Sequence, residues 1–181
     1  GESHVQELVA KHDALPKDIE WHFIGHLQTN KVKYIAPFVS LIHAVDSERL
    51  LIEIDKQAKR SGRTIPVLLQ VHVAKETTKF GFTPDELLNF MENGDWRQYT
   101  NIRFSGIMCM ATNTDDKQEW RRCFREIKHL GEQLLSHSEL PNNSAPQISM
   151  GMSDDYLVAI EEGSTMVRIG STIFGIRASK H

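Results

Sequence analysis

The chain has 181 residues, of which 40% are hydrophobic and 25% charged, and 24 acidic and 21 basic side chains give it a formal charge of −3. This composition is typical of a globular domain, and we expect a single domain over residues 1–181. The mixed charges argue against a partner that is a nucleic acid or an anionic membrane, and two cysteines are too few for a disulfide framework. With no apolar run long enough to cross a bilayer and no signal peptide, we expect a cytoplasmic protein that binds a small molecule.

Short β-rich runs alternate with amphipathic helical stretches along the chain. The strands are expected at residues 21–25, 41–45, 66–74, 103–111, 147–151 and 165–169. The helices are expected at residues 27–35, 48–60, 84–93, 117–136 and 154–162. Three of them are expected to start at Asp46-Ser47, Thr83-Pro84 and Thr114-Asp115, where a short oxygen-bearing side chain or a proline suits the first turn. This alternation predicts a parallel sheet built from βα units, and the nearly continuous hydrophobic strands indicate a sheet that is covered on both faces.

The first residues begin directly with a helical pattern at Val5, Leu8 and Val9, without a β-rich run before it. We therefore expect the chain to begin partway through its fold. A closed α/β barrel has eight strands and about 250 residues, so a barrel would lack two strands here or nearly so. The alternative is a doubly wound open sheet, which six strands would fill, although the Gly-rich fingerprint after a first strand is missing.

The ends of the last two expected strands carry residues suited to binding a phosphate. Ser153 follows the fifth strand and is expected to open a helix, while Gly170 and Ser171 follow the sixth. A hydroxyl, the free amides of a first helical turn and a glycine that a ligand can approach closely all favour an anion. In barrels the phosphate commonly lies at the loops after the last two strands. The alternative is that each loop is only a helix cap or a turn.

Arg168 lies within the last expected strand, on the same face as Met166 because alternate residues of a strand share a face. A guanidinium among apolar neighbours needs a partner, since burying an unpaired charge is costly. That partner is either a ligand or an acidic residue on a neighbouring strand, and spacing alone leaves both open.

Six motifs, which span nearly the whole chain in order, resemble those of the pyridoxal phosphate homeostasis protein family. They lie at residues 21–31 (WHFIGHLQTNK), 43–47 (HAVDS), 79–82 (KFGF), 106–111 (GIMCMA), 149–155 (SMGMSDD) and 167–175 (VRIGSTIFG). The resemblance implies a TIM-type (β/α)8 barrel like the N-terminal domain of alanine racemase, here without its first strand-helix unit and most of its second strand. It also implies binding of pyridoxal 5′-phosphate without an established catalytic turnover.

The resemblance further implies which residues contact this cofactor. Its phosphate would be held by Ser153 and the amides of Gly170 and Ser171, its pyridine nitrogen would face Arg168, and its ring would be lined by Ile24 and His22. Arginine has only donors, so a nitrogen bonded to Arg168 must accept and stay unprotonated, which makes the ring a weaker electron sink. This chemistry favours a noncatalytic role.

The family's aldehyde-binding lysine lies on the first barrel strand, which the given residues do not include. We therefore expect no covalent Schiff base in this chain as given. Lys79 and Lys31 lie within family motifs and are the alternatives, but a Schiff-base lysine needs a dry, preshaped pocket that lowers its pKa, and most lysines are solvated.

Three functions remain open from the sequence. The first is a pyridoxal phosphate-binding protein of intracellular vitamin B6 and amino-acid homeostasis, expected as a monomer or weak homodimer. The second is a racemase-like enzyme, and the third an interaction protein with a degenerate ligand site. A metal site is not expected, because the nine histidines show no HExxH pair and His43 and His72 are interpreted as hydrogen-bonded strand histidines.

Overall fold

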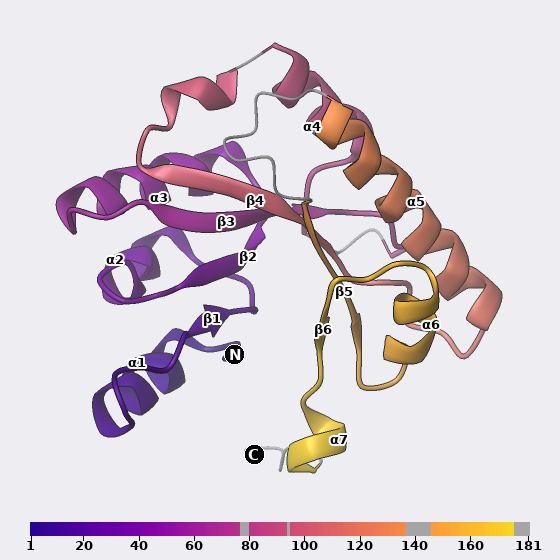
Figure 1. Ribbon diagram of the computed structural model, residues 1–181, viewed down its shortest axis with the longest axis horizontal. Helices are drawn as coiled ribbons and strands as arrows, with labels where there is room; N and C mark the ends of the chain where they lie inside the picture. The colour runs from indigo at the N-terminus through magenta and orange to yellow at the C-terminus, as the bar shows by residue number, and fades with distance from the viewer. Residues whose placement is uncertain (77–79, 94, 137–145, 176–181) are drawn as a thin grey trace.

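A computed structural model describes residues 1–76, 80–93, 95–136 and 146–175. Six parallel strands form one sheet in which each strand lies beside its neighbour in the chain (Figure 1). The strands are β1 (His22–Phe23), β2 (Leu41–Val45), β3 (Ile65–Val71), β4 (Ile102–Cys109), β5 (Gln147–Met152) and β6 (Met166–Arg168). All six strands expected from the sequence are confirmed, with bounds that differ by a few residues.

The first helix precedes β1 and the others follow strands, and the helices that cover the sheet lie on its outer side (Figure 1). They are α1 (Val5–Ala14), α2 (Val32–Ile35), α3 (Glu48–Arg60), α4 (Pro84–Glu92), α5 (Lys117–Ser136), α6 (Tyr156–Glu161) and α7 (Ser171–Phe174), with 3-10 turns η1 (Thr29–Lys31) and η2 (Asp95–Gln98). The expected doubly wound alternative is wrong, because such a sheet reverses its strand order whereas this one keeps it from β1 to β6. The architecture is half of a barrel.

The outer, helix-covered face of the sheet carries the main apolar core. Alternation within each strand sends one set of side chains to this face, where helices α3, α5 and α6 cover them. Buried strand residues of this core are Phe23, Ile42, Val67, Ile107, Ile148 and Met150. The concave face holds a much smaller apolar cluster, made by Leu41, Ala44, Leu68 and Met108 with Met110 and Met166 against it. The rest of the concave face is therefore available to polar side chains.

The first residues of the chain lie along the outer edge of β1. Glu2 forms a parallel bridge with Phe23, in which the Glu2 amide donates to the carbonyl of His22 at 3.0 Å. The Ile24 amide donates in turn to the Glu2 carbonyl at 3.0 Å. The first residues therefore pair with β1 through a single bridge.

Helix starts were only partly foreseen. Thr83 caps α4 in a reciprocal capping box with Glu86, as its Thr-Pro pair predicted. The hydroxyl of Ser47, expected to cap α3, donates instead to the Asp46 carboxylate at 3.0 Å. For α5 the expected Thr114 and Asp115 are wrong, because the carboxylate that accepts from the first turn, at the Gln118 amide, belongs to Asp116.

Over the residues described, no helix combines the length and the apolar character that crossing a membrane requires. Within the same residues, no three His, Cys, Asp or Glu side chains are placed to share a metal ion.

Candidate functional site

Four polar side chains from β1, β2, β5 and β6 meet on the concave face. His22 Nδ1 lies 3.1 Å from His43 Nε2, and His43 Nδ1 lies 2.9 Å from Ser149 Oγ. Arg168 Nη1 donates to the same Ser149 oxygen at 2.8 Å. His43 is only 1% exposed and Ser149 is fully buried. We call these four residues the polar chain; it crosses between strands that are not neighbours, since β3 and β4 separate β2 from β5.

Arg168 is held by the backbone and is not ion-paired with any carboxylate of the described residues. Its Nη1 donates to the Ser149 carbonyl at 2.9 Å and its Nη2 to the Cys109 carbonyl at 2.8 Å. With the bond to Ser149 Oγ, three of the five guanidinium N–H groups are used. The salt bridge that the sequence left open is thus not what holds Arg168, and donors remain for a ligand. Burial lowers the pKa of Arg168 from its usual value.

The loops after β5 and β6 meet at Ser153, as the sequence predicted. Ser153 Oγ accepts from the amides of Gly170 and Thr172 at 3.3 and 3.4 Å. Gly170 and Ser171 stand at the N-terminus of α7, a four-residue helix that sequence analysis missed. The contact of the Thr172 amide with Ser153 was also not predicted, because Thr172 lies in α7 and this helix was not expected.

Ser153 does not open a helix, so that part of the prediction is wrong. Helix α6 begins three residues later at Tyr156, and Asp155 occupies its N-cap position. The Asp155 carboxylate accepts from the Met152 amide at 2.6 Å, which ties the end of β5 to the turn. Burial raises the pKa of Asp155. Ser153 therefore does not cap α6, and its hydroxyl contacts the loop after β6 instead.

The remaining sequence candidates fall into two groups. Ile24 directly follows β1 and is two residues from His22, so both belong to the same edge of the concave face. Lys31 lies on η1, with its Nζ 5.7 Å from the centre of the Tyr34 ring and no contact with the polar chain. Lys79 lies outside the described residues.

The two strand histidines behave differently. His43 is a hydrogen-bonded strand histidine as expected, whereas His72 lies just outside β3, and its Nδ1 is buried without a hydrogen-bond partner among the described residues.

Both histidines of the polar chain are neutral at neutral pH. Burial, followed by unfavourable electrostatic interactions with His22 and Arg168, lowers the pKa of His43 to about 3. Burial also lowers the pKa of His22. Neutral imidazole has one donor and one acceptor nitrogen, so each ring can pass a hydrogen bond from one side to the other.

The depressed pKa of His43 makes stability depend on pH. Between the unfolded value of 6.5 and the folded value of about 3, only the unfolded chain takes up the proton. The free energy of unfolding therefore falls as the pH falls, and we expect His43 to contribute a loss of about 1.5 kcal/mol between pH 6.5 and pH 5. Urea unfolding at several pH values measures this slope. Between pH 6.5 and pH 5, the loss of unfolding free energy should be smaller by that amount in His43→Gln and unchanged in the exposed control His129→Gln. An equal loss in all three proteins would contradict the assignment.

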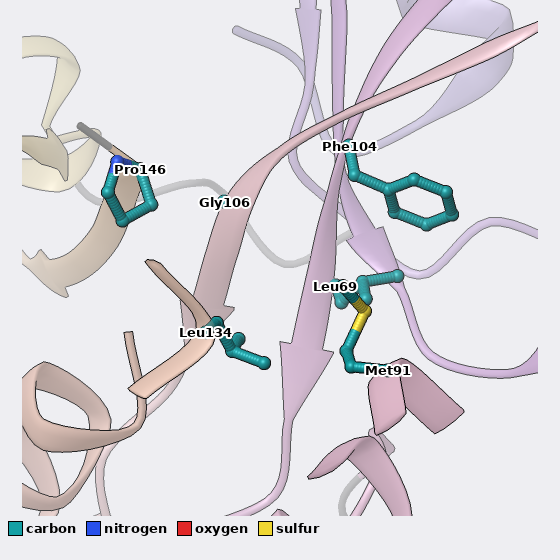
Figure 2. Close-up of a pocket in the computed structure, with 6 residues that line it drawn as sticks. All are labelled: Leu69, Met91, Phe104, Gly106, Leu134 and Pro146. Atoms are coloured by element: carbon teal, nitrogen blue, oxygen red, sulfur yellow. The ribbon is translucent and has the colours of Figure 1, made fainter. Parts of the chain in front are cut away.

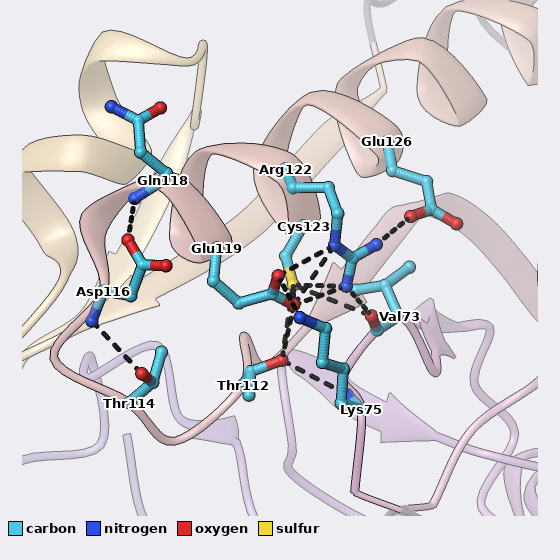
Figure 3. Close-up of polar contacts among 10 residues, drawn as sticks. All are labelled: Val73, Lys75, Thr112, Thr114, Asp116, Gln118, Glu119, Arg122, Cys123 and Glu126. Carbon is cyan, nitrogen blue, oxygen red and sulfur yellow. Dashed lines mark hydrogen bonds and ion pairs between the residues drawn. The ribbon is translucent and has the colours of Figure 1, made fainter.

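A second polar cluster lies at the ends of β3 and β4 (Figure 3). The Glu119 carboxylate of α5 accepts from Arg122 at 2.7 Å and from Thr112 at 3.1 Å, and pairs with Lys75 at 2.8 Å. Hydrogen bonds from Arg122 and Lys75 lower the pKa of Glu119 to about 2. Because its partners come from the protein itself, this cluster fastens α5 to the loops that follow β3 and β4.

A small cavity lies on the outer side of the sheet, away from the polar chain (Figure 2). It is lined by Leu69, Met91, Phe104, Gly106, Leu134 and Pro146. The volume that the centre of a water molecule can occupy in it is about 10 Å³. This is barely room for one water molecule. A cofactor cannot bind in this cavity.

Comparisons with known proteins show which family the chain is similar to over nearly its whole length. The family model described as alanine racemase, N-terminal domain, matches residues 1–178. The chain is 42% identical over 178 residues to the pyridoxal phosphate homeostasis protein of Aquifex aeolicus, covering 98% of this chain and 76% of the relative, and 36% identical over 180 residues to that of Haemophilus influenzae, covering 98% and 74%.

Solved structures give the same picture. PipY of Synechococcus elongatus, solved with pyridoxal phosphate bound, matches with a TM-score of 0.84 and 31% identity over 97% of this chain and 80% of PipY. An alanine racemase of Clostridium difficile matches with a TM-score of 0.74 over 98% of this chain and 44% of the racemase. At 15% identity, the racemase shows a common fold and nothing more.

Proposed function

The chain belongs to the pyridoxal phosphate homeostasis protein family, and we propose that it binds pyridoxal 5′-phosphate on the concave face of its half-barrel, in intracellular vitamin B6 and amino-acid homeostasis. The observation that carries the proposal is Arg168, a guanidinium that is anchored by backbone carbonyls and still has N–H groups to offer. Its neighbours on the same edge, the loops joined at Ser153, supply a place for the phosphate.

The hydroxyl of Ser153 fits an anion. Its oxygen accepts from the amides of Gly170 and Thr172, so both of its acceptor positions are occupied and its proton is directed outward as a donor. The exposed amide of Ser171 at the start of α7 adds a further donor in the same loop. Donors without a competing carboxylate are what a phosphate dianion requires.

The concave face also fits a pyridine ring. Arg168 would donate to the ring nitrogen, and Ile24 and His22 would line the ring from β1. When bound, pyridoxal phosphate supplies an aldehyde and an electron-withdrawing ring, but a nitrogen that accepts from arginine stays unprotonated and withdraws electrons less strongly. This supports binding and release of the cofactor over catalysis, in keeping with the names of the relatives.

The wider assignment rests on the same comparisons. The six parallel strands in chain order would form part of an eight-stranded barrel, completed by strands beyond the edges of β1 and β6. The protein would act in the cytoplasm as a monomer or weak homodimer. The likeness to racemases concerns the fold alone and favours no second function.

The test is a titration with 4′-deoxypyridoxine 5′-phosphate, which has the ring and phosphate but no aldehyde, so that no lysine is needed. We expect saturable quenching of tryptophan fluorescence and competition by pyridoxal phosphate. Ser153→Ala should weaken binding about tenfold, because the hydroxyl-phosphate bond is charge-assisted. Ser61→Ala, at the far end of α3, serves as the matched control. A folded protein that shows no saturable binding of either ligand would refute the proposal.

A further inference from the structure

The polar chain allows the direction of each of its hydrogen bonds to be derived. Arginine has no acceptor, so in the 2.8 Å contact between Arg168 Nη1 and Ser149 Oγ the guanidinium must donate. This fixes the first link, and Ser149 accepts in it.

Ser149 must then pass its own proton onward. Its side chain is fully buried, where a hydroxyl proton without an acceptor is costly. Of its two hydrogen-bond partners among the described residues, Arg168 cannot accept, which leaves His43 Nδ1 at 2.9 Å. His43 Nδ1 therefore carries no hydrogen, and the neutral ring has its proton on Nε2.

The same reasoning extends to the last member. His43 Nε2–H lies 3.1 Å from His22 Nδ1, so His22 must accept there. A neutral His22 with an accepting Nδ1 has its proton on Nε2. The far side of this half-buried ring consequently offers a donor and never an acceptor.

We propose that Arg168, Ser149, His43 and His22 form a one-way hydrogen-bond chain, in which buried His43 is a positioning residue that sets the His22 ring as an Nε2–H donor toward the ligand. The direction of the chain follows from the geometry alone. The part that concerns the ligand rests on the proposed function: His22 would select a ring substituent that accepts a hydrogen bond, such as the ring oxygen of pyridoxal phosphate.

The direction is tested on the unaltered protein by long-range nitrogen-proton NMR spectra of ¹⁵N-histidine, assigned with His22→Asn and His43→Asn. We expect both rings to be neutral, with unprotonated Nδ1 and protonated Nε2. A proton on Nδ1 of either ring would overturn the one-way chain, whether or not the protein binds any cofactor.

Variants test the transmission along the chain. Ser149→Ala removes the donor to His43 and should give His43, and through it His22, a mixture of tautomers. Ser164→Ala is the matched control, because its hydroxyl donates to the carbonyls of Met150 and Met166 and takes no part in the polar chain. Unchanged tautomers in Ser149→Ala would overturn the transmission.

Two substitutions of His43 test the effect on the ligand. Gln can place an amide N–H near the position of Nε2 and retain a donor to His22, whereas Leu cannot. With 4′-deoxypyridoxine 5′-phosphate as the probe, we expect affinity to fall about tenfold in His43→Leu and to be largely rescued in His43→Gln. If the tautomers are as derived but Leu binds as tightly as wild type, the positioning role is refuted while the proposed cofactor site stands.

Discussion

Arg168→Met is expected to weaken binding of pyridoxal phosphate by 10- to 100-fold, on the order of the loss of one charge-assisted hydrogen bond. The same change should lower the free energy of unfolding by about 2–4 kcal/mol, because the carbonyls of Ser149 and Cys109 lose their donor. Arg168 thus joins β4, β5 and β6, and in the proposed site it would also face the ligand. Removing the arginine should therefore lower both the stability of the fold and the affinity for the cofactor.

Fluorescence titration and urea unfolding measure the two effects separately. Arg103→Met is the matched control, since Arg103 is an exposed arginine on β4, and it should change neither quantity appreciably. Arg168→Lys gives a second check, because an ammonium group keeps the charge but cannot reproduce the planar fork that reaches two strands. If a folded Arg168→Met protein binds the cofactor with wild-type affinity, Arg168 does not belong to the site.

The strands and most helices were predictable because their patterns are local. The hydrophobic run of β3 and the amphipathic repeat of α5 each depend only on neighbouring residues, and both elements occur where expected. The exceptions are elements that depend on distant contacts. Helix α7 has four residues, too few for a periodic pattern, and it forms where its Gly170 and Thr172 amides meet Ser153.

The site was predictable in its parts but not in its connections. The alternation of β6 predicted that Arg168 shares a face with Met166, and the family motifs implied that Ser153 and Gly170 serve the same site. The link from Arg168 to His43 through Ser149 could not be read from spacing, because His43 on β2 lies 106 residues from Ser149 on β5. Only the curvature of the sheet brings the concave sides of β2 and β5 within hydrogen-bonding distance.

The close approach of β4 to β5 requires a glycine at position 106. Gly106 pairs with Gln147 and has a φ of +147°, a conformation that residues with a side chain rarely adopt. A Cβ there would lie 1.9 Å from the Gln147 carbonyl oxygen and 2.6 Å from its amide nitrogen. Both are backbone atoms of the neighbouring strand, so no side-chain rotation can relieve the clash.

Gly106→Ala should therefore lower the free energy of unfolding by about 3 kcal/mol or more, by urea denaturation. Gly62→Ala separates the effect of the positive φ from the effect of the steric clash. Gly62 also has a positive φ, of 63°, but nothing lies within 4 Å of its Cβ position, so we expect a cost of about 1 kcal/mol. Pushing β5 away from β4 would also separate the Ser149 and Cys109 carbonyls that hold Arg168 between them. Cofactor affinity should then fall in Gly106→Ala and not in Gly62→Ala. If the two alanine variants are equally stable, the close approach of the strands does not hold the concave face in shape.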